Sequence, residues 1–275
     1  MTESTIERRN LRLAFDAERP RHWHSGNARI SRFYDALSMS FPPGEKSFIE
    51  SVRDFADGIE DEDLQKDIQG FIRQEADHTR EHARYNATLK AQGVDVDFHT
   101  SLTAKPVELT RRYLSPKRNL ARTVGMEHIT AILSDLALSD PRVLKNADEQ
   151  VRRIWNWHAI EEIEHKGVAF DVFEQAVPNK LERYFLRTTV MLWSTLGYSV
   201  GMTTSLTLLL WHDRKLFDPR DWWRAFQFFW IRPAVIPRAF GRWLAYFRPG
   251  FHPWQHDNRE LAKTYAAELD RAENA

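Results

Sequence analysis

Residues 155–167 place ionisable side chains inside a strongly apolar pattern. This segment contains two histidines and three glutamates, and its bulky apolar neighbours are Trp155, Trp157, Ile160, Ile163 and Val168. Ionisable groups that are buried among apolar side chains cost free energy unless a partner compensates for their lost hydration. The chain is therefore restricted to folds that bring a suitable partner to these groups.

Apolar residues at spacings of three and four predict long helices in the first two thirds of the chain. Glycine and proline residues mark the ends of these segments. The expected helices cover residues 45–59, 62–92, 116–138 and 146–177, and residues 93–115 are expected to form a long connection. Because no convincing strand pattern occurs, the sequence predicts an all-α fold, a ferritin-like four-helix bundle with additional C-terminal helices.

Capping residues mark two of the expected helix starts. Ser115 is expected to cap the third helix with Pro116 as its first residue, because the N–H that proline lacks is unused in a first turn. Asn146 and Glu149 have the spacing of a capping box. This spacing predicts the start of the fourth helix.

Composition excludes several classes of function. Lysine plus arginine equals aspartate plus glutamate at 39 each, so no general attraction to nucleic acid is expected. The chain has no cysteine, which excludes disulfides, thiolate catalysis and cysteine-ligated metals. The first 18 residues lack an apolar stretch, so no cleavable signal peptide is expected and the expected location is cytoplasmic.

Glutamate and histidine share one face of the second and the fourth expected helices. With 100° of rotation per residue, His78 falls about 60° from Glu75 around the helix axis. On the fourth helix, Glu162 falls about 40° and His165 about 20° from His158. Each helix therefore carries a Glu-x-x-His pair on a narrow face.

The other two helices each offer one glutamate in an apolar setting. At about 1.5 Å per residue, all four glutamates fall at a similar level of an antiparallel bundle. One glutamate from each of two helices and Glu-x-x-His from each of the others is the ligand pattern of di-iron and di-manganese bundles. Two cations would be the partner that these buried groups need. The predicted metal ligands are Glu45, Glu75, His78, Glu127, His158, Glu162 and His165.

Three further residues have roles that the sequence leaves open. Glu161 competes with Glu162, and Glu162 is preferred because it repeats the Glu-x-x-His spacing of the second helix. His82 and His128 are interpreted as ligands, as outer partners of ligands or as structural residues.

Five segments resemble a bacterial family catalogued as predicted metal-dependent hydrolases. They read PRHWHSGN, FPPGEKSFIESVR, FIRQEADHTREHARYN, MEHITAIL and WHAIEEIEHKGVAFDVF. The ligand order also resembles the ferritin-like di-iron superfamily. A histidine four residues before the last glutamate is similar to the arrangement in p-aminobenzoate N-oxygenases, which implies that His158 is a seventh ligand.

Two functions from different chemical classes fit such a centre. In the first, two iron ions, with manganese accepted in one or both positions, activate dioxygen to oxidise or oxygenate a small organic substrate. That function implies an electron donor such as a reductase or a ferredoxin. In the second, a water activated between the two metals hydrolyses the substrate. Iron storage, peroxide removal and a purely structural bundle are further alternatives.

The last third of the chain differs from the rest in composition. Most of the ten tryptophans lie after residue 190, and residues 188–211 contain no charged side chain. That length can span a bilayer, although nine of these residues are serine or threonine. We expect two units: residues 1–180 form the di-metal bundle with an N-terminal extension, and residues 181–275 form an apolar, Trp-rich helical extension. The extension either packs on the bundle or associates with the inner face of the membrane. If it packs on the bundle, it covers an apolar channel or forms a homodimer contact.

Overall fold

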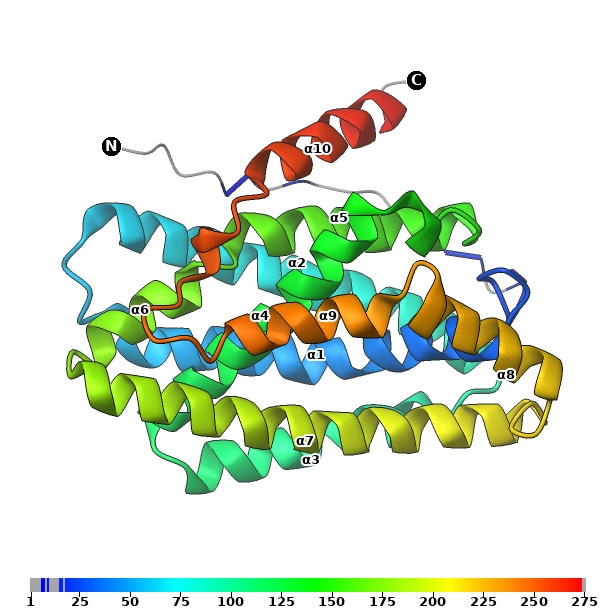
Figure 1. Cartoon of the computed structure of the whole chain (residues 1–275), viewed down its shortest axis with the longest axis horizontal. Coiled ribbons are helices and arrows are strands. Elements are labelled where there is room, and N and C mark those ends of the chain that lie inside the picture. The colour runs from blue at the N-terminus through cyan, green and yellow to red at the C-terminus, as the bar shows by residue number, and fades with distance from the viewer. Residues whose placement is uncertain (1–5, 8, 10–14, 17, 274–275) are drawn as a thin grey trace.

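Helices dominate the molecule (Figure 1). The computed structural model describes residues 6–7, 9, 15–16 and 18–273, and no β-strand occurs among them. The predicted all-α fold class is confirmed. The helices are α1 (Ala28–Ala56), α2 (Glu62–Ala91), α3 (Val96–Tyr113), α4 (Pro116–Ser139), α5 (Glu149–His165), α6 (Val168–Ala176), α7 (Lys180–His212), α8 (Pro219–Phe226), α9 (Val235–Ala245) and α10 (Arg259–Glu273), with shorter helical turns at Pro141–Val143, Gln227–Ile231 and Pro253–Gln255.

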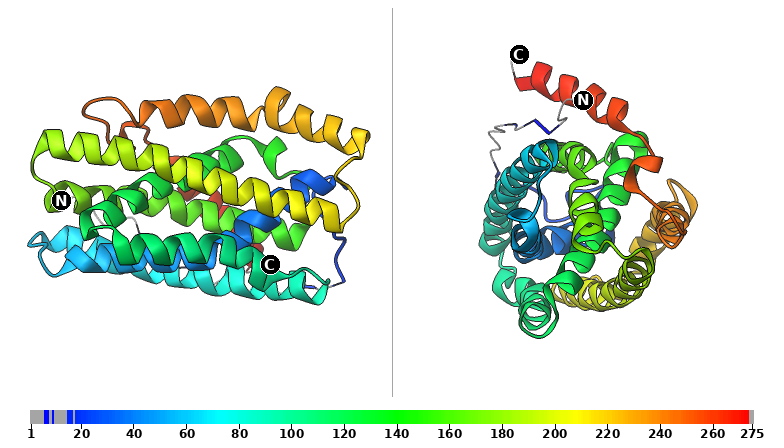
Figure 2. Two further views of the ribbon diagram at one scale, coloured as in Figure 1. Left: turned by 90° about the horizontal axis from the view of Figure 1, so that it is seen from below. Right: turned by 90° about the vertical axis from the view of Figure 1, so that its left-hand side faces the viewer.

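Four of these helices surround a shared interior. α1 packs along α2 and α4 along α5, while α1 also contacts α4 and α2 contacts α5. α6 contacts α1, α2 and α4. The end-on view in Figure 2 shows these helices around a common axis, with α3 and α7 outside them. The more specific ferritin-like topology stays a prediction.

The apolar core lies in two clusters along these helices. One cluster includes Met39 of α1, Tyr85 of α2, Leu136 of α4 and Trp157 of α5. The other includes Val52 of α1, Ile68 of α2, Leu120 of α4 and Val172 of α6. Between the two clusters, the helices carry buried carboxylates and imidazoles. Apolar packing on both sides therefore holds the polar section of each helix in place.

The first central helix is longer than the sequence predicted. It begins at Ala28 and not near residue 45, and two adjacent prolines lie inside it. Proline normally breaks a helix because it cannot donate a backbone hydrogen bond. Pro42 leaves the carbonyl oxygen of Ser38 without its helical donor, and the buried Asn86 side chain donates to that oxygen at 3.0 Å. The helix therefore continues through the prolines.

The predicted long connection at residues 93–115 is wrong, because most of it forms α3. The Asp95 side chain caps this helix by accepting a hydrogen bond of 3.1 Å from the N–H three residues later. α3 packs against α1 and α7. The helix carries Pro106 in its interior, and only His99 in it is fully buried. Because this segment lacks a continuous apolar stripe, no helical period predicts it.

The predicted fourth helix is two helices, α5 and α6, separated at Lys166 and Gly167. Lys166 donates hydrogen bonds to the backbone oxygen of His256 and to Oδ1 of Asn258, both at 2.6 Å. These two hydrogen bonds therefore connect the segment before α10 to the end of α5.

One of the predicted helix starts is right and the other is wrong. α4 begins at Pro116 as predicted, although the Ser115 side chain makes no capping hydrogen bond. Asp148, and not Asn146, caps α5 by accepting hydrogen bonds from the first turn. Asn146 instead accepts a backbone hydrogen bond of 2.9 Å from Ser25.

The uncharged stretch 188–211 lies in α7, which packs against α1, α3 and α4. α9 in turn contacts α4, and α8 contacts α1. Among the helices of the described residues, none combines the length and the apolar character that crossing a membrane requires. α7 begins at the predicted boundary near residue 180, and the division of the chain into two units stays a prediction.

We expect Gly167→Ala to destabilise the protein. A Cβ at this position would lie 2.3 Å from Nε1 of Trp254. Because the indole is rigid, the chain must shift, at an expected cost of about 1–3 kcal/mol in the free energy of unfolding. The matched control is Gly241→Ala in α9, where an added Cβ meets nothing within 4 Å. Denaturant unfolding compares them, and equal stabilities would contradict the close approach at Gly167.

Candidate metal centre

The four central helices bring the predicted ligands into one buried region. Each of these side chains is at most 3% exposed. They lie on α1 (Glu45), α2 (Glu75 and His78), α4 (Glu127) and α5 (His158, Glu162 and His165). So many ionisable groups in a dry interior require compensating charge.

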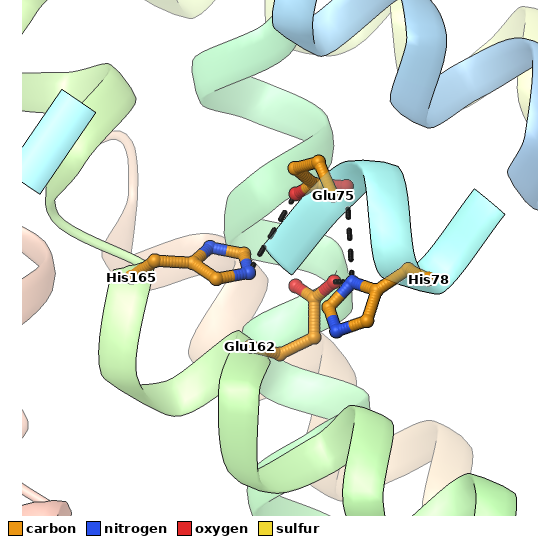
Figure 3. A group of neighbouring side chains, drawn as sticks. All are labelled: Glu75, His78, Glu162 and His165. Atoms are coloured by element: carbon orange, nitrogen blue, oxygen red, sulfur yellow. Dashed lines mark ion pairs between the residues drawn. The ribbon is translucent and has the colours of Figure 1, made fainter. Parts of the chain in front are cut away.

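Glu75, His78, Glu162 and His165 form the first group of candidate ligands (Figure 3). Each offers an atom within 4.8 Å of the others. Nδ1 of His78 lies 3.8 Å from both Oε2 of Glu75 and Oε1 of Glu162, and Nε2 of His165 lies 3.6 Å from Oε1 of Glu75. These distances are too long for hydrogen bonds. Two atoms that each bind one cation at about 2.1 Å lie about 3.0 to 4.2 Å apart, so the spacing suits a shared cation.

Glu45, His82 and His158 form the second group, whose ligand atoms also lie within 4.8 Å of one another. His158 links the two groups, since its Nε2 lies 2.9 Å from Oε1 of Glu162. Nδ1 of His158 faces Nε2 of His82 at 2.9 Å, and Nδ1 of His82 faces Oγ of Ser38 at 2.8 Å. The region thus offers two adjacent cation positions, and His82, whose role the sequence left open, belongs to one of them.

Glu127 lies beside the first group and outside both groups. Its Oε2 is 3.2 Å from Nδ1 of His165, and its Oε1 is buried without a hydrogen-bond partner. The structure therefore places Glu127 next to a candidate ligand, where it contributes negative charge to the region.

Six buried atoms of the predicted ligands have no hydrogen-bond partner in the described structure. They are Oε1 of Glu45, both carboxylate oxygens of Glu75, Oε1 of Glu127, Nδ1 of His78 and Nε2 of His165. Buried polar atoms are nearly always paired, so a cluster of unpaired atoms needs an explanation. All six are of the types that bind metal ions, and cations between them would satisfy them together. The residues present therefore fit a metal pair.

Glu161 and Glu162 have different positions in this arrangement. Oε2 of Glu161 lies 3.0 Å from Nε2 of His78, and its other oxygen accepts a hydrogen bond of 3.0 Å from Nε1 of Trp157. A carboxylate on one ring nitrogen leaves the other nitrogen of the histidine free to bind a metal. Glu161 thus orients the His78 ring through Nε2 and leaves Nδ1 free, while Glu162 lies within the first group.

Two threonines that the sequence analysis did not single out hold carboxylates in place. Thr79 donates to Oε2 of Glu45 at 2.9 Å, and Thr130 donates to Oε2 of Glu162. Their sequence positions offered a signal, because one directly follows His78 and the other lies one helical turn after Glu127.

Burial raises the pKa of several carboxyl groups in the centre. Burial, with added repulsion from Glu127, raises the pKa of Glu75 to about 8. Burial also raises the pKa of Glu45 and of Glu127 well above the usual value. Burial acts in the same direction on Glu162, but its hydrogen bond to His158 and the attraction of the surrounding histidines together outweigh burial and lower its pKa to about 2. Carboxyl groups with raised pKa values keep their protons until a cation replaces them.

The pKa values of the buried histidines shift in opposite directions. Burial lowers the pKa of His158 to about 4 and that of His82 well below the usual value. For His78, burial lowers the pKa, but the hydrogen bond to Glu161 and the attraction of Glu161 and Glu75 together outweigh it and raise the pKa. The neutral imidazoles of His158 and His82 are in the form that binds metal ions.

His128 and Glu164 are structural residues in this fold. Nε2 of His128 lies 3.2 Å from the backbone oxygen of Arg242, and its ring stacks on Tyr246 with the centroids 5.0 Å apart. Glu164 forms an ion pair of 2.7 Å with Arg9. Neither residue belongs to a group of candidate ligands.

An apolar pocket of about 530 Å³ adjoins the candidate ligands. Its walls come from α1, α3, α4 and α7 and include Phe41, Phe48, Met126, Ile129 and Trp193. Glu45 and Glu162 also line it, so the pocket contacts one residue of each group. The residues of α4 that line it run from Arg118 to Leu133, a distance of about 22 Å along the helix axis.

Two buried groups of histidine and glutamate in an all-α fold define a candidate metal-dependent enzyme. The chain belongs to a protein family described as "Predicted metal-dependent hydrolase", whose model matches residues 7–257. This finding confirms the family resemblance drawn from the sequence motifs. Neither the curated proteins nor the solved structures gave a match to the chain.

We expect chelation to lower the melting temperature of the protein, and to lower it more near pH 8 than at about pH 5. Glu75, with its pKa raised to about 8, stabilises the metal-free fold fully below the ordinary glutamate pKa. That contribution is lost as the pH rises through the raised value. Bound cations prevent the loss by pairing with the ionised carboxylates. Calorimetry with and without EDTA measures the difference, and an effect that does not grow with pH would contradict this account.

Proposed function

We propose that the protein is a di-iron enzyme that uses dioxygen to oxidise or oxygenate an apolar organic substrate. Mixed carboxylate and imidazole ligation suits iron and also accepts manganese in one or both positions. A bound iron pair would supply the redox chemistry, in which one oxygen atom of dioxygen enters the substrate and the other leaves as water, with two electrons from a reductase or a ferredoxin and two protons from the solvent. The residues that would hold the metals are those of the two groups, Glu45, Glu75, His78, His82, His158, Glu162 and His165, and Glu127 beside the first group would add negative charge.

The position of the apolar pocket carries this proposal. A substrate in the pocket lies beside Glu45 of the second group and Glu162 of the first. The candidate ligands are at most 3% exposed and the pocket beside them is lined mainly by apolar side chains, so an apolar substrate that fills the pocket would keep bulk water from the reacting atoms. Exclusion of water favours oxidation of an apolar compound, whereas hydrolysis consumes water.

The surrounding residues contribute by fixing the ligand atoms. Glu161 holds the His78 ring through Nε2, and His82 faces Nδ1 of His158. Thr130 donates a hydrogen bond to Glu162 at the pocket wall. Ligands that are fixed in this way keep their geometry while the substrate enters and leaves.

Hydrolysis is the second candidate function, and the family description favours it. The same residues would hold the metals, and the pocket would hold the bond to be cleaved. The two functions differ in one requirement that is simple to test, because hydrolysis proceeds without dioxygen.

We expect protein loaded with ferrous iron under nitrogen to consume dioxygen when air is admitted, with a new near-ultraviolet or visible absorption band. Glu162→Gln removes a carboxylate that the pocket and the first group share, and it should lower the oxygen uptake at least about tenfold. Glu182→Gln, at the half-exposed start of α7, is the matched control and should leave the uptake unchanged. An oxygen electrode and absorption spectra make the measurement.

Two results would contradict the proposed function. A metal-loaded protein that stays colourless in air and cleaves esters or phosphoesters under nitrogen would contradict the oxidative function and support hydrolysis. Equal oxygen uptake by Glu162→Gln and Glu182→Gln would show that the reaction occurs elsewhere.

A further inference from the structure

Arg122 of α4 is a buried arginine without an acidic partner. It lines the apolar pocket and is only 9% exposed. Within the described residues, its side chain donates one hydrogen bond, from Nη2 to Oγ of Ser47, and its Nε is buried without any partner. The nearby Arg111 instead pairs with the carboxylates of Asp54 and Glu50. Buried arginines are normally paired, because the loss of hydration is costly.

The protein compensates the charge of Arg122 only in part. Burial, followed by repulsion from Arg111, lowers its pKa to about 10, and the attraction of Glu50, which is itself paired with Arg111, acts in the opposite direction. A guanidinium in this state has free donors in a planar arrangement that matches a carboxylate. An anionic group in the pocket would therefore supply the missing partner.

Arg122 and the metal groups face the same pocket from different levels. Thr130, which bonds to Glu162, lies eight residues after Arg122 on α4, or about 12 Å along the axis. On α1, Ser47 lies two residues after Glu45, which also lines the pocket. A molecule held at Arg122 thus extends past the carboxylates of both groups.

The pocket has unfilled space for such a molecule. Gly44 of α1 and Gly197 of α7 belong to its lining, and an added Cβ at either position meets nothing within 4 Å. A larger side chain at Gly197 would therefore occupy pocket space without a clash with the protein.

We propose that Arg122 anchors the anionic end of an elongated apolar monocarboxylate, whose hydrocarbon part lies along the pocket beside the metal groups. The identification of this molecule as the substrate rests on the proposed function. Its binding to the pocket does not, so the two claims are tested separately.

The test compares dodecanoate with dodecanol, its uncharged counterpart, by calorimetric titration of the metal-loaded protein under nitrogen. We expect dodecanoate to bind at least about tenfold more tightly, because the alcohol leaves Arg122 unpaired. Arg122→Gln should abolish this preference, and Arg122→Lys should keep part of it. Arg73→Gln, at an exposed position on α2 outside the pocket, is the matched control and should keep it in full. Gly197→Leu should weaken the binding of both compounds.

Equal binding of the two compounds to the unmodified protein would overturn the proposal, even if Arg122→Gln does not fold. A preference that survives in Arg122→Gln would also overturn it, because the carboxylate would then be held by the metals. If the preference is found and no oxidation occurs, the anchoring role stands and the proposed function fails.

A separate observation concerns the outside of the molecule. The outer faces of α8, α9 and the turn between them carry apolar side chains that are 40–58% exposed, which we call the aromatic surface: Trp222, Trp223, Phe226, Trp230, Ile231, Ile236, Phe240 and Leu244. Figure 2 shows α8 and α9 as an outer layer along one side. Soluble monomers rarely leave so much apolar surface uncovered.

The charge of this segment is as unusual as its apolar content. Residues 214–248 contain eight arginines and lysines and two aspartates, in a chain of zero net charge. Five of the arginines are exposed and lack a carboxylate partner among the described residues: Arg214, Arg220, Arg224, Arg232 and Arg248. Tryptophan and arginine together are typical of helices that lie in a membrane interface.

We infer that the aromatic surface binds an anionic phospholipid bilayer, with the rings at headgroup level and the unpaired arginines on lipid phosphates. Flotation with vesicles of phosphatidylcholine, with and without phosphatidylglycerol, tests this. Binding should require phosphatidylglycerol and weaken with salt. The double variant Arg224→Gln and Arg232→Gln should lower the binding at least about tenfold. The control is Arg73→Gln with Arg112→Gln, an equal charge change at exposed positions on α2 and α3.

Three results would overturn this inference. The first is that the protein binds neither kind of vesicle, and the second is that the control pair loses as much binding as the test pair. The third is a stable dimer, seen by light scattering, that Trp223→Ser converts to a monomer, because a second copy would then cover the aromatic surface.

Discussion

The fold depends on how it compensates for the burial of carboxylates and imidazoles. Glu75, His78 and His165 are fully buried, and atoms of all three lack hydrogen-bond partners. Such groups are tolerated only with opposite charge or with a bound proton. The apolar clusters on either side keep the helices together, and they hold these groups at one level of the bundle. A cation pair would turn this unfavourable arrangement into a stable one and would couple metal binding to folding.

The outer helices give this centre its surroundings. α3 and α7 close the side of the bundle and leave a pocket that runs past Glu45 and Glu162. The pocket is lined mostly by apolar side chains, and among the described residues the buried Arg122 lines it without an ion pair. α8 and α9 then form an exposed surface with aromatic and basic side chains. Together these features suit a reaction on an amphiphilic molecule that reaches the enzyme from a lipid surface.

The sequence-based predictions succeeded where they rested on apolar periodicity and on fixed residue spacing. The starts of α2 and α4 and the all-α class followed from apolar spacing and from Pro116. Helical geometry also allowed the seven candidate ligands to be selected, because a Glu-x-x-His pair shares one face wherever the helix lies. The extension of α1 through Pro42 was not predictable, since it depends on Asn86 from another helix. For the same reason, the contact of Glu161 with His78 and the isolation of Arg122 required the folded structure.

The most direct test of the account is the number and the position of the metal ions. Diffraction from crystals of the iron-loaded protein, recorded on both sides of the iron absorption edge, locates them without reference to activity. The account predicts two anomalous peaks, one among Glu75, His78, Glu162 and His165, and one among Glu45, His82 and His158. No peak between the four helices, or iron bound only at the protein surface, would contradict it.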